Sequence, residues 1–354
     1  MNAPLNIRVL TISKNTNACC NHCAFCSAGE KHLENIPFKR YVNIVERFLD
    51  WQEREKPEIV LASAIGYTHA TMTYEQSKIY RELCERGHYR PLPLQMNGCI
   101  FMPEDDLARM MEGHRRAGYE VYSQTYTGFR SLHDKWAGRK GEFDYLMTMA
   151  NVASELGYIR QEQILLTKRS LPELGKLVDA LEKLDCPYTR EIYQPSYTGW
   201  AKRLERDRID RKDLDQVPKD LRKYLKVEDP LTHSAHLSEA ETISWVRTNY
   251  RDDLLRDAYV AAPLTEQNLE WMENEDCDAI FENIIARYRD VYDRLPKMTE
   301  LCELYGDEKN DKLYGLYELE RKWSGQYISS HLSEYADRYN HLSGWLYPRS
   351  KQNY

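Results

Sequence analysis

The stretch that decides the fold of this chain is Cys19-Cys20-Asn21-His22-Cys23-Ala24-Phe25-Cys26. Three of its cysteines, Cys19, Cys23 and Cys26, have the spacing C-x3-C-x2-C. An apolar run over residues 7–12 precedes the stretch, and a polar segment separates the two. We therefore expect a strand, then a loop that carries three thiols, then a helix.

The thiols narrow the chemistry of this loop. Thiolates are soft ligands that select iron–sulfur clusters, zinc or copper(I). A cubane iron–sulfur cluster is usually held by four thiolates. Three thiolates on a cubane leave one iron open, and an open metal position is what catalysis needs.

The spacing after the first expected strand, with an aromatic residue just before the last cysteine, resembles the radical SAM superfamily. The resemblance implies that Cys19, Cys23 and Cys26 hold one [4Fe-4S] cluster, that its open iron binds S-adenosylmethionine, and that Phe25 packs near the adenine. It also implies that an electron from the cluster splits the sulfonium and yields a 5′-deoxyadenosyl radical, which takes a hydrogen atom from the substrate. The cofactors carry this chemistry while the protein orients them.

A zinc-stabilised interaction protein and a redox cysteine pair are the alternatives. Structural zinc takes four ligands. Cys20 or His22 could be the fourth, but the adjacent Cys19 and Cys20 cannot easily both reach one tetrahedral ion. A redox pair of Cys23 and Cys26 would ignore Cys19. Disulfides are not expected, because nine cysteines are an odd number and there is no secretory signal.

Composition excludes several classes of protein. The chain has 354 residues, of which 42% are hydrophobic and 30% charged, so it can bury a sizeable core. It contains no apolar run of the roughly 20 residues that a membrane helix needs, and no targeting peptide, which predicts a cytoplasmic protein. The net charge of −7 argues against broad nucleic-acid binding.

The fold class is predicted from the order of elements. Six strands alternate with helices, which implies parallel pairing through right-handed crossovers. The order matches the partial (β/α)6 barrel of the radical SAM family, with the cysteines at the C-terminal ends of the strands, where such folds build their sites. The expected strands cover residues 7–13, 58–64, 93–96, 119–125, 159–166 and 189–193.

Helix ends and domain limits follow from local signals. Pro37 suits the first position of a helix, and the pairs Thr73/Gln76 and Ser170/Glu173 have capping-box spacing. Three regions are expected. Residues 1–200 form the partial barrel, 201–230 a charged connector, and 231–354 a helical C-terminal region with helices near 239–250, 269–272, 279–295 and 314–339.

Two further segments resemble peptide- and protein-modifying members of the family. They are residues 132–144, with Leu-His-Asp and Gly-Glu-Phe-Asp, and residues 195–201, with a Gly-x-Ala element after the sixth strand. By position, Ser123 and Gln124 at the end of the fourth strand would approach S-adenosylmethionine.

The chain departs from the family pattern at three places. The usual Gly-Gly-Glu-Pro after the second strand is replaced, so only backbone contacts from Ala64 and Gly66 are expected there. Ala137 stands where an arginine is frequent, and Arg139 is the nearest substitute. Only Cys277 and Cys302 follow Cys186, too few for auxiliary clusters, so a single cluster is expected.

The leading functional hypothesis is a radical SAM enzyme, of lyase or oxidoreductase type, that modifies a ribosomally made precursor peptide. Epimerisation, cross-linking and backbone excision are the candidate reactions. The chain starts at the barrel strand, so a separate leader-binding protein or the C-terminal region would hold the leader, and flavodoxin or ferredoxin would donate the electron. The alternative substrate is a small sugar or nucleoside intermediate.

Overall fold

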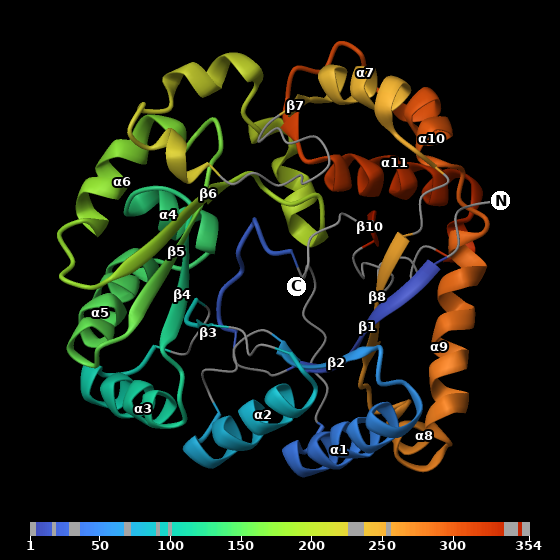
Figure 1. Ribbon diagram of the computed structural model, residues 1–354. Helices are drawn as coiled ribbons and strands as arrows, with labels where there is room; N and C mark the ends of the chain where they lie inside the picture. The colour runs from blue at the N-terminus through green and yellow to red at the C-terminus, as the bar shows by residue number, and fades with distance from the viewer. Residues whose placement is uncertain are drawn as a thin grey trace.

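The computed structural model describes residues 5–15, 19–27, 36–66, 72–89, 93–97, 101–225, 237–252, 256–335 and 346–348. Two four-stranded sheets curve around a common centre, and helices cover their outer faces (Figure 1). One sheet has the order β10-β8-β1-β2 and the other the order β3-β4-β5-β6. The predicted α/β class with parallel strands is confirmed.

All six expected strands are present. Each neighbouring pair among β1–β2 and β3–β6 is parallel, as crossover connections require. In the described part of the chain, β2 and β3 belong to separate sheets. The strands are β1 (Leu5–Asn15), β2 (Val60–Gly66), β3 (Leu94–Gln95), β4 (Val121–Tyr126), β5 (Ile159–Leu165) and β6 (Tyr188–Tyr193).

The helical expectation for the C-terminal region missed the strands of that region. β8 (Arg256–Pro263) pairs in parallel with β1, and β10 (Leu346–Pro348) pairs antiparallel with β8. The run that forms β8 is short and apolar, and such a run does not distinguish a buried strand from a helical segment. Burial of Ala258, Val260 and Ala262 against the sheet decides in favour of the strand.

Helices fill both halves of the chain. The first half contains α1 (Phe38–Glu55), α2 (Tyr74–Arg86), α3 (Glu104–Arg116), α4 (Ser131–Ala137), α5 (Glu142–Glu155) and α6 (Leu174–Leu181). The second half contains α7 (Glu239–Asn249), α8 (Leu269–Asn274), α9 (Cys277–Tyr292), α10 (Met298–Tyr305) and α11 (Leu316–His331), with the short strands β7 (Leu237–Ser238) and β9 (Leu313–Tyr314). Among the helices that the structure describes, none has both the length and the apolar character needed to cross a bilayer.

One predicted capping box is confirmed and one is wrong. The Thr73 hydroxyl accepts from the Gln76 backbone N–H at 3.2 Å, and the Gln76 side chain accepts from the Thr73 N–H at 3.1 Å. Ser170 instead exchanges hydrogen bonds with Thr167, which lies three residues earlier and competes for its hydroxyl. Glu173 is thereby free to accept from the Phe129 backbone N–H at 3.1 Å.

The charged connector is built from the 3₁₀ helices η3 (Gly199–Asp207), η4 (Arg211–Gln216) and η5 (Arg222–Tyr224). Its Arg208 is buried, and its guanidinium donates to the Leu313 carbonyl at 2.9 Å and to the Glu318 carboxylate at 2.8 Å. These bonds tie the connector to β9 and α11. The three-domain division itself stays a prediction.

A buried ion network ties β5 to β6 on the side that faces the helices. Glu162 accepts from Arg160 at 2.7 Å and from Arg190 at 2.5 Å, and all three side chains are fully buried. Arg190 also pairs with the half-exposed Glu182 at 3.1 Å. Glu162 is therefore the carboxylate on which two buried guanidinium groups depend.

We predict that Glu162→Ala lowers the free energy of unfolding by about 3–5 kcal/mol, because it leaves two buried positive charges without their shared partner. Glu182→Ala is the matched control and costs at most about 1 kcal/mol, since that carboxylate is half-exposed. Urea unfolding followed by circular dichroism measures both. Equal losses in the two variants would contradict this account of the network.

Candidate functional site

The cysteine loop, residues 19–27, lies in the centre of the molecule between the two sheets, where Figure 1 draws it in dark blue. It follows β1, whose last residues 13–15 pair in parallel register with Ala64 to Gly66 of β2. The expected backbone contacts of Ala64 and Gly66 therefore lie at the C-terminal end of the strand beside the one that leads into the loop. The polar segment expected between the first strand and the cysteines includes residues 16–18, which lie outside the described residues.

One side of the loop is bonded to the C-terminal end of α4. The His22 backbone N–H donates to the Ala137 carbonyl at 3.0 Å, and the Ala24 N–H donates to the Trp136 carbonyl at 2.8 Å. These are strand-like backbone bonds made by a segment without strand structure. They fix the path of the chain between Cys20 and Phe25.

Side chains reinforce this contact. The Asn21 amide donates to one oxygen of the fully buried Glu142 carboxylate at 2.9 Å, and Arg139 donates to the other oxygen. Arg139 also contacts the Cys20 sulfur, and its guanidinium lies 3.7 Å from the centre of the Phe101 ring. The structure therefore brings the predicted Arg139 to the loop, as part of its anchor.

Glu142 and Asn21 are site residues that the sequence analysis missed. Both stood inside motifs that were quoted for the family resemblance, but neither received a role. The available signal was Glu142 in the first turn of a helix, directly after a glycine. A carboxylate at a helix N-terminus can accept several hydrogen bonds in a favourable field, which suits an anchor for a loop.

The other side of the loop is bonded to the start of η3. The backbone N–H groups of Trp200 and Ala201 donate to the Cys26 carbonyl at 2.9 and 3.3 Å. These residues belong to the Gly-x-Ala element after the sixth strand. The loop is thus held from both flanks by the two segments that carry the secondary resemblance.

Phe25 joins these flanks through packing. It lies in a small apolar cluster with buried Trp136, Leu165 and Leu204, and Tyr193 packs against the same cluster. Trp136 comes from α4, Leu165 from β5 and Leu204 from η3. Phe25 therefore fills the space between the strand ends and both flanking segments. Its predicted place near an adenine stays a prediction.

The thiols themselves differ in exposure. Cys23 is buried, Cys19 and Cys26 are half-buried, and Cys20 is exposed, and none of the four forms a disulfide. Within the described residues, no three His, Cys, Asp or Glu side chains are arranged closely enough to hold a metal ion. The three thiols therefore do not form a preassembled site, and their role as ligands stays a prediction. As a donor set, three thiols on one tethered loop fit an iron–sulfur cluster.

Ser123 and Gln124, which were expected at the end of the fourth strand, lie in the middle of β4 and point to opposite faces of the sheet. The Gln124 amide donates to the Leu146 carbonyl of α5 at 2.9 Å and accepts from Tyr126 at 2.5 Å, so it belongs to the packing between sheet and helices. Ser123 therefore faces the centre, because successive strand residues alternate. Its hydroxyl is fully buried and, among the described residues, has no hydrogen-bond partner. The geometry keeps Ser123 in the candidate site and separates Gln124 from it.

Gln194, directly after β6, is a second buried polar group without a partner and was not predicted. Its side chain is 3% exposed, and neither atom of its amide has a hydrogen bond within the described part of the protein. An unpaired buried polar group costs about 1–3 kcal/mol. Ser123 in the middle of β4 and Gln194 just after β6 would therefore gain hydrogen bonds from a polar ligand or an ordered water.

The inner face of this sheet is polar as well. Thr125 of β4 donates to the Gln163 side chain of β5 at 3.2 Å, on the face opposite Gln124. Asn97, after β3, exchanges two bonds with the Thr125 backbone, at 2.6 and 2.9 Å. These side chains are half-buried. A polar, partly hydrated interior suits a charged ligand better than an apolar one.

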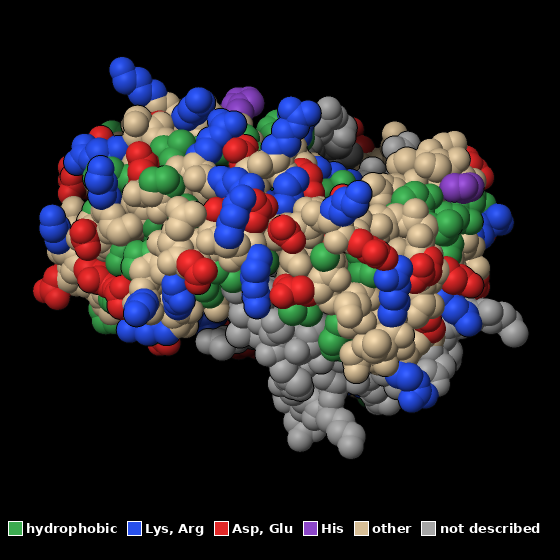
Figure 2. Space-filling view, turned by 90° about the horizontal axis from the view of Figure 1, so that it is seen from above, with side chains coloured by type: hydrophobic (Ala, Val, Ile, Leu, Met, Phe, Trp, Pro, Cys, Tyr) green, Lys and Arg blue, Asp and Glu red, His purple; other side chains and the backbone are tan. Residues whose placement is uncertain are grey.

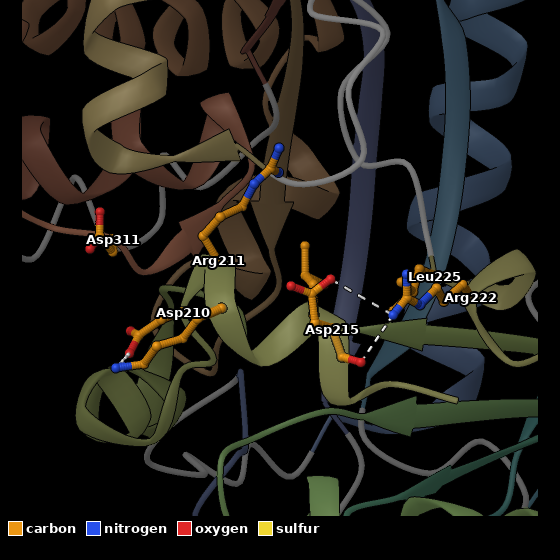
Figure 3. A pocket seen from close by; sticks show the side chains of 8 residues that line it. Asp210, Arg211, Asp215, Arg222, Leu225 and Asp311 are labelled. Atoms are coloured by element: carbon orange, nitrogen blue, oxygen red, sulfur yellow. Dashed lines mark hydrogen bonds and ion pairs between the residues drawn. The ribbon is translucent and has the colours of Figure 1, made fainter. Parts of the chain in front are cut away.

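A pocket of about 590 Å³ lies elsewhere, in the connector (Figure 3). Most of its charged side chains are in ion pairs, among them Asp210 with Lys168 at 2.6 Å and Asp215 with Arg222 at 3.8 Å. It is formed by η4, η5 and the turn before β9. Because the cysteine loop lies elsewhere and most of the charges of this pocket are paired, we do not place the reaction there.

The two cysteines that follow Cys186 are structural in character. Cys277 packs in the main core and Cys302 in a separate cluster of the C-terminal helices, and both are buried. Burial raises the pKa of the Cys302 thiol to about 11 and also raises that of Cys277. Two neutral thiols in separate cores cannot bind one metal together.

Comparison with known proteins gives structural likeness only. No protein-family model matches the chain, and no curated protein matches it. Solved structures do match it. One is "Coproporphyrinogen III oxidase (HemN) from Escherichia coli is a Radical SAM enzyme", with 14% identity and a TM-score of 0.42 over 62% of this chain and 52% of that one. Another is Streptococcus suis SuiB bound to S-adenosylmethionine, with 16% identity and a TM-score of 0.43 over 62% of this chain and 48% of that one. A third is native anSMEcpe with bound AdoMet and Cp18Cys peptide, with 14% identity and a TM-score of 0.46 over 94% of this chain and 99% of that one.

The chain is therefore similar in structure to a radical SAM enzyme and to proteins seen with S-adenosylmethionine. It spans about half the length of the first two. With identities of 14–16% and TM-scores below 0.5, these likenesses do not by themselves fix activity, ligands or site residues.

Gly138 provides a test of the contact between α4 and the loop. It has φ +70°, and a Cβ there would lie 2.9 Å from the His22 carbonyl oxygen. Gly157 also has φ +70°, but a Cβ there meets nothing within 4 Å. Alanine at either position costs about 1 kcal/mol of stability through backbone strain.

We predict that only Gly138→Ala moves the cysteine loop. Alkylation of the native protein, followed by mass spectrometry, should show faster labelling of Cys19, Cys23 and Cys26 in that variant than in the wild type. Gly157→Ala should label at the wild-type rate despite its similar loss of stability. Identical labelling in both variants would show that the loop does not depend on close packing against α4.

Proposed function

We propose that this chain is a radical SAM enzyme that holds one [4Fe-4S] cluster through Cys19, Cys23 and Cys26 and binds S-adenosylmethionine beside it. The observation that carries the proposal is the placement of the cysteine loop. It lies at the ends of parallel strands and is bonded on both sides to the segments that resemble the family, residues 132–144 and 195–201. Cysteine spacing and three-dimensional placement are independent of each other and agree.

The chain's own residues would divide the work as follows. Cys19, Cys23 and Cys26 would supply three thiolates, which leaves one cluster position for a ligand. When bound, the cluster would supply the electron that splits the sulfonium of S-adenosylmethionine. The hydrogen bonds to Ala137, Trp136 and Cys26 oxygens hold the loop still, so that little reorganisation is needed when the cofactors bind.

Polar groups of β4 and of the segment after β6 would orient S-adenosylmethionine. The unpaired Ser123 hydroxyl and Gln194 amide are buried and would gain hydrogen bonds to its ribose or its amino-acid portion. The backbone at Ala64 and Gly66 would receive the amine, since no side chain is available there. Phe25 would cover one face of the adenine and exclude water from it.

For the substrate, we propose a ribosomally made precursor peptide. The support is the resemblance of residues 132–144 and 195–201 to peptide- and protein-modifying members. The half-buried side chains of Thr125 and Gln163 line a polar interior. This interior would accept the backbone of a peptide as well as its side chains. Epimerisation, cross-linking and backbone excision are the reactions that this proposal covers. A separate leader-binding protein would hold the leader of the precursor.

Single cysteine variants test the cluster assignment. We predict that Cys19→Ala, Cys23→Ala and Cys26→Ala each abolish the brown colour after anaerobic reconstitution and the formation of 5′-deoxyadenosine. Cys20→Ala keeps both, because Cys20 falls outside the spacing. Loss of the cluster in Cys20→Ala together with its retention in Cys19→Ala would overturn the assignment.

Isotope transfer tests the substrate class. We predict that the reconstituted enzyme, given S-adenosylmethionine and precursor peptides deuterated at Cα or Cβ, moves deuterium into 5′-deoxyadenosine and changes the peptide mass. Sugars and nucleosides serve as the comparison set. Deuterium transfer from a sugar or nucleoside, and from no peptide, would replace the peptide proposal while leaving the cofactor chemistry intact.

A further inference from the structure

A row of polar side chains crosses the inner face of the sheet β3-β4-β5-β6. Thr125 of β4, Gln163 of β5 and Glu191 of β6 are paired in parallel register, so the three residues lie side by side on neighbouring strands. Such strands are about 4.8 Å apart. All three residues are half-buried, so they line space that water or a ligand can reach. We call these three residues the inner row.

The inner row faces the centre of the molecule because the preceding residues face the helices. Glu162 precedes Gln163, and Arg190 precedes Glu191. Glu162 and Arg190 form the buried ion network on the helix side of the sheet. Successive side chains of a strand point to opposite faces, so Gln163 and Glu191 point inward.

The inner row lies next to the layer that packs against the cysteine loop. Two residues further along β5 and β6, Leu165 and Tyr193 are again in register, and both pack in the cluster that contains Phe25. Two strand residues span about 6.6 Å. A substrate group held by the inner row would therefore lie close to the cofactors of the proposed function.

A hydrogen bond sets the direction of the Gln163 amide. The Thr125 hydroxyl donates to Gln163 Oε1 at 3.2 Å, and Asn97 in turn fixes Thr125 through two bonds to its backbone. Because the amide oxygen is held by Thr125, the Nε2 of the same planar group is turned away from it. Within the part of the chain that the structure describes, Nε2 makes no hydrogen bond. Gln163 therefore offers N–H donors to a ligand.

Glu191 offers acceptors beside these donors. A carboxylate has about four acceptor positions, so Glu191 can accept from a ligand in addition to bonds within the protein. A donor next to an acceptor matches an amide group, which carries a carbonyl oxygen and an N–H side by side. Glu191 would repel a carboxylate, whereas a cation or an apolar group would leave the Gln163 N–H groups without an acceptor.

The wall around Gln163 is polar without being charged. Ser123 and Gln161 are in register with each other one step further from the cysteine loop, on the same face as Thr125 and Gln163. Over the face drawn in Figure 2, by contrast, Lys, Arg, Asp and Glu side chains lie interspersed. An interior of hydroxyls and carboxamides favours an uncharged polar group, because an ion would lose its hydration there without a full exchange of partners.

We propose that Gln163 and Glu191 bind one amide group of the substrate. Gln163 donates to its carbonyl oxygen, Glu191 accepts from its N–H, and Thr125 is a positioning residue that orients Gln163. This rests on the proposed function and names the substrate group that its site selects. The amide comes either from a side-chain carboxamide or from the backbone of a peptide.

Binding of small amides tests the proposal on the reconstituted full chain with S-adenosylmethionine and an oxidised cluster, so that no reaction starts. The probes are asparagine, alanine, aspartate and diaminobutyrate, each acetylated at its amine and methylamidated at its carboxyl group. Ligand-observed saturation-transfer NMR measures their affinities. The alanine probe carries backbone amides only, so its comparison with the asparagine probe separates the two sources of the amide.

The test variant is Gln163→Glu, which removes the N–H donors and adds a negative charge. Gln161→Glu is the matched control, because it makes the same change at a half-buried position on the same face of the same strand. We expect Gln163→Glu to weaken binding of the asparagine and alanine probes about three- to tenfold, and Gln161→Glu to change it by less than about twofold. A tighter asparagine probe indicates a carboxamide, and equal affinities indicate the backbone; both support the proposal.

The Thr125 hydroxyl gives a second readout. Thr125→Val should weaken binding of the asparagine probe, because the Gln163 amide loses its orientation, whereas Thr125→Ser keeps the hydroxyl and should bind like the wild type. Tighter wild-type binding of the aspartate or diaminobutyrate probe overturns the proposal, as do equal effects of the two glutamine variants or no binding of any probe. A wild-type chain that takes up no cluster refutes the proposed function instead.

Discussion

The account depends on the clamp that holds the cysteine loop. Four backbone hydrogen bonds, two to carbonyls of the α4 end and two from amides at the start of η3, fix a segment that has no regular structure of its own. The buried Glu142 carboxylate adds side-chain bonds from Asn21 and Arg139. Because a loop of thiols carries a large conformational entropy when free, this clamp is what makes it a defined place in the molecule.

The clamp links the functional loop to distant parts of the chain. The segment between β6 and η3 is held by Arg208, which bonds the Pro195 carbonyl, and by Glu318 of α11, which accepts from the Tyr197 backbone N–H at 3.1 Å. Burial of the Arg208–Glu318 pair makes its geometry specific, since either charge alone would be costly in the interior. The C-terminal helices therefore contribute to the site through the chain that supports Cys26.

Sequence predicted the parts of the fold that local signals determine. Strand order followed from alternating elements, and the Thr73 box from spacing alone. The strand β8 was missed because its apolar run is short, and only its neighbour β1, about 250 residues away, selects the extended form. Ser170 was assigned the wrong partner because Thr167 offers an equivalent hydroxyl, a competition that spacing does not reveal. Gln124 was placed in the site because the alternation of side chains along a strand was ignored. Its hydrogen bond to the Leu146 carbonyl shows that its side chain points to the opposite face of the sheet.

The central claim is that three thiols hold a cubane cluster with one position left for S-adenosylmethionine. Electron paramagnetic resonance of the anaerobically reconstituted, dithionite-reduced protein tests it most directly, with and without S-adenosylmethionine. The account predicts about four iron and four sulfide per chain and a cluster signal that changes when S-adenosylmethionine is added. A colourless protein with one zinc per chain, or a cluster signal that S-adenosylmethionine leaves unchanged, would contradict it.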